Sequence, residues 1–196
     1  MNFIIVIYEL FRMLFFGIQK GIFYKPNGVK LASYLESLGP IFTKFGQLLS
    51  TRTDILDVET AKDLESLTDS CKPFNVETLK KIVESELGDS IENIFESFNE
   101  KPLAAASLAQ VHSATLSNGD HVVVKVLRPN IHKKVKRNLR LLKSAAKIFS
   151  YIYSESYRLK PNEVVRDYES TILKELDLKL EASNTCLLYT SPSPRD

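Results

Sequence analysis

An Asn-Gly pair at positions 118 and 119 lies between two runs of β-forming residues, and it restricts the fold more than any other feature. The runs are AAASLAQVHSATL before it and HVVVKVL after it. Asn-Gly between two such runs is the strongest short-range sign of a β-hairpin. Pro129 follows the second run and ends it, because proline cannot donate a ladder hydrogen bond. We therefore expect an antiparallel hairpin in the middle of the chain.

Two helices are predicted after the hairpin. Asn130 can cap the first, in which apolar residues recur at helical spacing: Ile131, Val135, Leu139, Leu142, Ala146 and Phe149. The second opens near Pro161 and carries its apolar residues on one face: Val165, Tyr168, Ile172, Leu176 and Leu180.

The first hundred residues show helical patterns instead. Capping residues and breakers divide them into four helices and a short helical turn. The predicted segments are Val29–Leu38, Pro40–Arg52, VETAKDLESL after Asp57, VETLKKIVESEL between Asn75 and Gly88, and IENIF after Ser90. The sequence thus predicts an α+β fold in which a helical extension precedes a sheet.

Composition narrows the classes of function. With 44% hydrophobic and 26% charged residues among 196, the chain is expected to fold. A net charge of +2 gives no field that would indicate a nucleic-acid partner. The cysteines and histidines have no metal-ligand spacing, so we expect no metal site among them and a reducing compartment. These residues are Cys71, Cys186, His112, His121 and His132.

The two ends of the chain need separate interpretation. The apolar stretch MNFIIVIYELFRMLFF has no basic region before it, and it is shorter than the ~20 residues of a membrane span. It is expected to form a helix, either buried against the protein or lying on a membrane surface. From Thr185 the chain continues as TCLLYTSPSPRD, which resembles a translated artefact at the end of an incomplete gene, and we exclude it from the fold.

Four short segments carry chemistry, and each also has a purely structural interpretation. In KFGQ, Lys44 and Gln47 share one helix face. They either form a functional element or are simply a solvated lysine and glutamine on a helix. The small-residue run LAAASLAQV, 103–111, either lets a phosphate approach the backbone or simply packs closely, and alanine disfavours the positive φ of a glycine loop.

The other two segments supply a cation and acids. In VVVK, Lys125 shares a strand face with Val123, while Val122, Val124 and Val126 pack on the other face. Lys125 needs a phosphate or carboxylate partner unless it is an edge-strand lysine. In KELDLKLEASN, Glu175 and Glu181 project in different directions on a helix and can serve two lysines, or form a solvated face.

The order of these segments is that of a protein-kinase N-lobe. With KFGQ upstream and AAAS in place of the glycine loop, the chain resembles the UbiB family of atypical kinases. The segments LGPIFTKFGQLLSTR, KPLAAASLAQVH, VVVKVLRP and PNEVVRDYESTILKELDLKLEASN carry the resemblance, which extends from about Leu31 to Asn184.

The resemblance implies a role for each site residue. Lys125 would contact phosphates and pair with Glu181, and Val123 would pack on adenine. Lys44 and Gln47 would form the KxGQ element that folds over the active site, with Lys44 meeting Glu175 of the ExD motif, Glu175 and Asp177. The alanine-rich nucleotide loop would comprise Leu103, Ala104, Ala105, Ala106, Ser107, Leu108, Ala109, Gln110 and Val111. The implied cofactors are ATP and Mg²⁺, with the catalytic Asp and the metal ligands expected in a C-lobe beyond Asn184.

The resemblance also implies a function and a place in the cell. The expected function is an ATP-binding atypical kinase or ATPase that supports ubiquinone biosynthesis, here truncated and unable to turn over ATP. Expected partners are nucleotide, membrane lipid and other ubiquinone-biosynthesis proteins, at the cytoplasmic face of a bacterial inner membrane. The alternative is a non-catalytic scaffold that binds a membrane or a partner protein. The expected divisions are 1–28, an apolar helix and linker; 29–100, the helical extension; 101–184, the kinase-like N-lobe; and 185–196, the tail.

A basic cluster in the helix after Asn130 has more than one interpretation. It is either a solvated face or a surface that binds nucleic acid or anionic lipid, and of these two ligands lipid is the better fit to a membrane-associated family. Its members are Lys133, Lys134, Lys136, Arg137, Arg140, Lys143 and Lys147.

Overall fold

The computed structural model describes residues 11, 13–21, 27–68, 70–152 and 156–183, and it confirms the predicted α+β class. Residues 13–19 are helical, whereas most of the apolar N-terminal stretch and the whole tail at 185–196 lie outside the described residues. The elements are α2 (Gly28–Leu38), α3 (Pro40–Ser50), α4 (Val58–Glu65), α5 (Val76–Leu87), α6 (Ile91–Ile94), β1 (Phe95–Phe98), β2 (Ala104–Ala105), β3 (Ala109–Leu116), β4 (His121–Leu127), α7 (Ile131–Ile152), α8 (Ser156–Leu159) and α9 (Pro161–Glu175).

The predicted caps explain where α4 and α5 begin and where α5 ends. The side chain of Asp57 accepts a hydrogen bond from Thr60 N at 2.8 Å, and that of Asn75 accepts one from Thr78 N at 2.9 Å. Gly88 ends α5 with a φ of 80°, in the left-handed region that glycine adopts readily. Ser90 precedes α6 but makes no side-chain capping bond.

The sheet is built around β3. The predicted hairpin pairs β3 with β4 from Ala109 opposite Leu127 to Thr115 opposite His121. The other edge of β3 pairs with β2 near its start and with β1 near its end. The first run of the hairpin is therefore not one strand: three residues, 106–108, separate β2 from β3.

Strand β1 corrects the sequence analysis, which placed Phe95 in a helical turn. Phe95 lies opposite Leu116 and Phe98 opposite Ala114, with an irregularity between Phe95 and Ser97. The extra residue brings two phenylalanines three positions apart onto one face of the strand, and this spacing mimics a helix in the sequence. Pairing with β3 decides the conformation.

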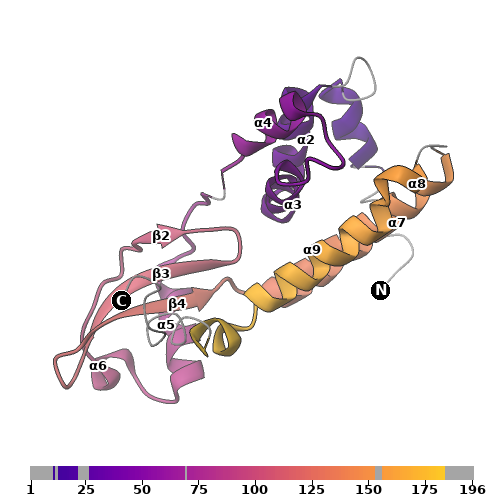
Figure 1. Cartoon of the computed structure of the whole chain (residues 1–196). Coiled ribbons are helices and arrows are strands. Elements are labelled where there is room, and N and C mark those ends of the chain that lie inside the picture. The colour runs from indigo at the N-terminus through magenta and orange to yellow at the C-terminus, as the bar shows by residue number, and fades with distance from the viewer. Residues whose placement is uncertain (1–10, 12, 22–26, 69, 153–155, 184–196) are drawn as a thin grey trace, which may run out of the picture.

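Two hydrophobic cores divide the molecule. The larger joins α2, α3 and α4 to α7 and α9, and Phe42, Leu64 and Ile172 in it have no exposed surface. The smaller lies between α5 and the sheet, where Leu79 and Val83 pack against Ala114 and Val126. Residues 76–98 thus pack on the sheet, although the sequence analysis grouped them with the helical extension. Figure 1 shows α5 and α6 beside the sheet and α2, α3 and α4 apart from it.

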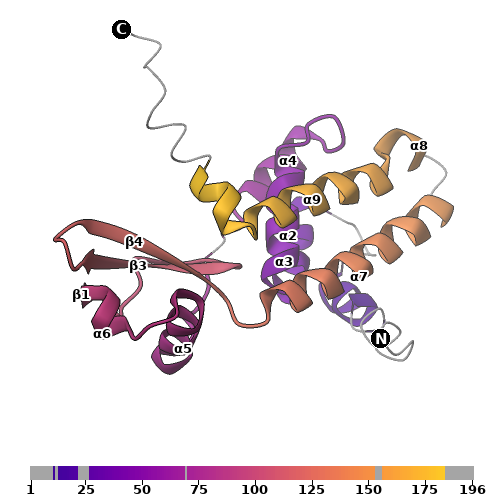
Figure 2. The ribbon, with the colours of Figure 1, turned by 90° about the horizontal axis from the view of Figure 1, so that it is seen from below.

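Helices α7 and α9 run side by side and are joined through α8 (Figures 1 and 2). Most of their predicted apolar faces are buried, but Phe149 is 42% exposed and Leu180 is 41% exposed. Leu180 leaves the core because α9 ends at Glu175, and a separate helical segment follows at 178–183.

Candidate functional site

The alanine-rich loop folds as a tight turn between β2 and β3. Ala104 lies opposite Val111 and Ala105 opposite Gln110, and Ala106 N donates to Ala109 O at 2.9 Å. No residue of this loop has a positive φ, so alanine adopts its backbone without strain. The loop is therefore a preformed turn that does not need glycine.

Arg128 stabilises this turn through hydrogen bonds to backbone carbonyl groups, a role that was not predicted from the sequence. Its Nε donates to Ala106 O at 2.7 Å and its Nη2 to Lys72 O at 2.9 Å, while its guanidinium lies 5.9 Å from the ring centre of Phe74. Cys71 N donates to Ala105 O at 2.9 Å. The one sequence feature that could have indicated this role is the position of Arg128 between an apolar strand and Pro129.

Gln110 and His112 form a buried chain of hydrogen bonds on the α5 side of the sheet. Gln110 is 1% exposed; its Oε1 accepts from Phe74 N, and its Nε2 lies 3.2 Å from His112 Nε2. His112 Nδ1 lies 3.0 Å from the carbonyl of Asn99, which only accepts, so Nδ1 donates and Nε2 accepts from the amide of Gln110. Gln110 and Leu108, which is 3% exposed, were both predicted to contact nucleotide, but their side chains are committed to the interior.

The opposite face of the sheet carries the predicted phosphate-binding lysine. Lys125 Nζ donates to both carboxylate oxygens of Glu181, at 2.6 and 2.8 Å. The two side chains are 32% and 41% exposed, so a ligand can reach them. Val123 lies on the same strand face and is 69% exposed. The structure therefore brings Glu181 to Lys125, on the strand face that also carries the exposed Val123.

Lys44 and Gln47 of α3 face different partners. Lys44 Nζ lies 2.8 Å from Glu175 Oε1, while Gln47 Nε2 donates to Leu67 O at 2.9 Å. Between them, Gly46 lets α3 pack closely, because a Cβ there would lie 2.4 Å from Leu67 Cδ1 and 2.7 Å from Leu35 Cδ1. Gln47 and Gly46 thus fix α3 in place, and Lys44 alone reaches the ExD segment.

Further contacts fix α3 along α9. The rings of Phe45 and Tyr168 meet edge to face at 5.1 Å, and the hydroxyl of Tyr168 donates to Ile41 O at 2.5 Å.

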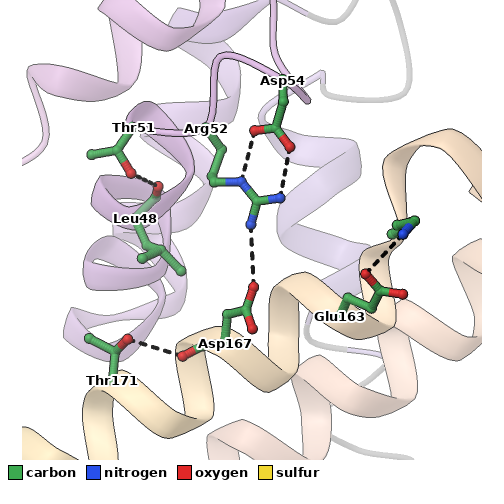
Figure 3. Close-up of polar contacts among 8 residues, drawn as sticks. Leu48, Thr51, Arg52, Asp54, Glu163, Asp167 and Thr171 are labelled. Carbon is green, nitrogen blue, oxygen red and sulfur yellow. Dashed lines mark hydrogen bonds and ion pairs between the residues drawn. The ribbon is translucent and has the colours of Figure 1, made fainter.

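Beyond the end of α3, Arg52 forms two 2.8 Å bonds to Asp54 and lies 3.5 Å from Asp167 of α9 (Figure 3). Hydrogen bonding to Arg52 lowers the pKa of Asp54, and the same bond raises the pKa of Arg52.

The helix is interrupted at Asp177, and this interruption separates the directions in which Glu175 and Glu181 point. One continuous helix was predicted over 174–184, but Asp177 Oδ1 accepts from Leu180 N at 3.1 Å and Asp177 O accepts from Glu181 N at 3.0 Å. Asp177 therefore begins a new helical segment, and the change of direction at this residue, rather than rotation along one helix, separates Glu175 from Glu181.

A groove of about 610 Å³ lies between α5, β4 and this segment. Its apolar wall includes Leu87, Val124 and Leu173, and its polar groups include Lys125 and Asp177.

The described residues contain no group of three or more His, Cys, Asp or Glu side chains able to hold a metal ion. Lys125 with its exposed strand face suits a nucleotide. The roles of all the predicted site residues in a reaction stay predictions.

Among the described helices, none combines the length and the apolar character that crossing a bilayer requires.

Comparisons with known proteins identify relatives of this chain. A family model described as the ABC1 atypical kinase-like domain matches residues 66–190. The chain is 46% identical over 182 residues to the probable protein kinase UbiB of Shewanella baltica strain OS185 and to that of Shewanella putrefaciens strain CN-32, covering 92% of this chain and 33% of each relative.

The chain thus spans about a third of the length of these curated relatives. A solved structure titled as the complex of Rv3197 with erythromycin, from Mycobacterium tuberculosis, aligns with 96% of this chain and 44% of its own, with a TM-score of 0.47 and 22% identity. The family match confirms the resemblance seen in the sequence: the chain belongs to the ABC1 atypical kinase-like family.

Proposed function

We propose that this chain supplies the nucleotide-binding part of an ATP-dependent atypical kinase or ATPase that supports ubiquinone biosynthesis. The Lys125–Glu181 ion pair carries the proposal, because protein kinases use a strand lysine held by a helix glutamate to contact the α- and β-phosphates. The name of the UbiB relatives supports the assignment to ubiquinone biosynthesis.

Each group near the pair has a part in binding. Lys125 would neutralise phosphate charge, and Glu181 would hold its ammonium in position. Val123, 69% exposed on the same face, would pack on the adenine ring. The turn at 106–108 would approach the phosphates through its backbone, since Leu108 is buried. ATP would bring the transferable phosphoryl group, and Mg²⁺ would neutralise it, with ligands from outside the described residues.

The KxGQ helix favours a small-molecule kinase or an ATPase over a protein kinase. Lys44 of α3 pairs with Glu175, and α3 is packed along α9 through Tyr168 and Phe45. A helix fixed next to the ExD segment would occupy space that a protein substrate needs. We expect the 196-residue chain to bind ATP without hydrolysing it, because a kinase also needs a catalytic base and metal ligands.

Fluorescence titration with a fluorescent ATP analogue tests the proposal. The 196-residue chain should bind it saturably, and Lys125→Met should weaken binding by about 10-fold or more, since a lysine–phosphate contact contributes on the order of 1.5–3 kcal/mol. Lys136→Met, an exposed α7 lysine with the same loss of charge, is the matched control. Equal affinity of the Lys125→Met variant and the wild type would reject the nucleotide site.

A specific observation also favours membrane binding as a second function. Three large side chains near the α7–α8 junction are strongly exposed: Tyr151 at 93%, Ile152 at 77% and Tyr157 at 79%. With the basic residues of α7, they would form a surface for an anionic membrane at the cytoplasmic face of a bacterial inner membrane. Tyr151→Ser with Ile152→Ser should then reduce sedimentation with anionic vesicles while ATP-analogue binding is unchanged; unchanged sedimentation would reject this surface.

A further inference from the structure

A second cavity, of about 410 Å³, lies away from the Lys125–Glu181 pair. It is bounded by the start of α3, the tip of the alanine-rich turn, the segment before α5 and the first turns of α7. Four of the described residues that line it are basic and none is acidic: Lys72, Arg128, Lys134 and Arg137. The cavity therefore concentrates positive charge from three separate segments.

The fold sets where these charges lie, and hydrogen bonds fix the side chain of Arg128. Lys134 and Arg137 are three positions apart on α7 and so lie on one face of the helix. The side chain of Arg128 is anchored by the carbonyl oxygens of Ala106 and Lys72, neither of which neutralises its charge. The cavity wall is thus cationic whether or not a ligand is present.

Within the described part of the chain, Lys72, Lys134 and Arg137 form no ion pair with a carboxylate. Some basic residues elsewhere do form such pairs: Lys44 pairs with Glu175, and Lys143 of the same helix α7 pairs with Glu169. Several like charges around one concave wall repel one another and attract a counter-ion. The charge pattern favours a ligand with more than one negative charge.

Neutral groups in the cavity suit an oxyanion. Ser107 and Asn138 offer hydrogen-bonding side chains at the wall. The cavity also meets the N-terminal end of α3, which has no acidic residue in its first turn and therefore adds partial positive charge.

We propose that this cavity binds a small phosphate-bearing anion. Arginine and lysine together match a phosphate group, with arginine giving directional hydrogen bonds and lysine a point charge. The basic residues of the cavity differ from Lys125 of the proposed nucleotide site, although Ser107 belongs to the turn at 106–108 that both sites use. Lys125 projects from the strand face that carries Val123, whereas Arg128 reaches back to the segment before α5.

Calorimetric titration of the 196-residue chain with sodium pyrophosphate, without Mg²⁺ and at low ionic strength, tests the proposal. The wild type should bind one pyrophosphate per chain. Lys134→Gln combined with Arg137→Gln should weaken binding by about 10-fold or more, because two charged contacts are lost. Lys133→Gln combined with Lys136→Gln is the matched control: both residues are exposed on α7, outside the cavity lining, and the loss of charge is the same.

The outcomes separate this site from general charge and from the nucleotide site. Binding that survives in the control and in Lys125→Met, but not in the cavity variant, supports the proposal. Equal weakening in the control shows a general charge effect, and loss in Lys125→Met places pyrophosphate in the nucleotide site; either result overturns it.

Vesicles of phosphatidylcholine with phosphatidate distinguish a lipid headgroup from a free phosphate compound. Sedimentation that depends on the cavity residues more than on the control residues, without pyrophosphate binding, supports the same chemistry with a headgroup as its source. Absence of both pyrophosphate binding and cavity-dependent sedimentation overturns the proposal. The melting temperature of each variant, measured without ligand, shows that it is folded.

Discussion

Gln110 offers the sharpest test of which loop residues are structural and which meet a nucleotide. The sequence resemblance predicts that it contacts nucleotide, but its side chain is 1% exposed and bridges Phe74 N and His112 Nε2. Gln110→Met keeps the length and approximate volume of the side chain and removes both hydrogen bonds. The variant therefore separates the two roles.

The expected loss of stability follows from the two partners that are left. The backbone N–H of Phe74 is part-buried, and His112 is fully buried with its other nitrogen bound to Asn99 O. An unsatisfied buried donor or acceptor costs about 1–3 kcal/mol, so the loss of two partners should lower the free energy of unfolding by about 2–6 kcal/mol. This is a large share of the roughly 5–15 kcal/mol that stabilises an ordinary domain.

Urea unfolding followed by far-UV circular dichroism measures the loss, since the chain has no tryptophan to serve as a fluorescence probe. Gln19→Met is the control: Gln19 is exposed on a helix, and its substitution should change the free energy of unfolding by less than about 0.5 kcal/mol. The folded Gln110→Met variant should bind ATP analogue almost as the wild type does. Unchanged stability together with a strong loss of ATP affinity would refute a structural role.

Three other predictions address the contacts around α3 and α9. Tyr168→Phe should lose about 1 kcal/mol with the bond to Ile41 O, a fall in melting temperature of about 2–4 °C, and Tyr34→Phe, at a half-buried tyrosine, should lose less; equal losses would contradict this. A double-mutant cycle of Lys44→Met and Glu175→Gln should give a coupling of about 0.5–1 kcal/mol, because both side chains keep some contact with water, and a coupling near zero would show that the pair is not formed in solution. The lowered pKa of Asp54 contributes stability that is present above pH ~4 and lost as the pH falls through the lowered value, so Asp54→Asn should reduce the loss of stability measured by acid titration; curves of equal steepness would refute the contribution.

Local signals made much of this fold predictable. The caps Asp57 and Asn75, the breaker Gly88 and the turn at Asn118 and Gly119 act within a few residues of themselves, and helices or strands begin and end where they indicate. The alternation in VVVK also places Lys125 on the exposed face of β4 and Val126 in the core, because a strand has a fixed period of two.

Contacts between distant segments could not be predicted in this way. The strand conformation of β1 depends on pairing with β3, and its bulge gives Phe95 and Phe98 a helix-like spacing. The bond from Arg128 to Lys72 O joins residues 56 positions apart. Nothing in the sequence near Gln110 indicates that its side chain will form hydrogen bonds with Phe74 and His112. In each case a local sequence pattern does not identify the residue that makes the contact.

The break at Asp177 gives the segment 175–181 a coupling role that one continuous helix would not provide. Glu175 at the end of α9 binds Lys44, which belongs to the helical core, and Glu181 in the next helical segment binds Lys125, which belongs to the sheet. The larger core is built mainly from the helices, and the smaller core mainly from α5, α6 and the sheet. The segment therefore connects the two parts of the molecule by one ion pair on each side of the break. A nucleotide phosphate bound to Lys125 would therefore lie next to one of these two links, while Glu181 holds the ammonium of Lys125 in position.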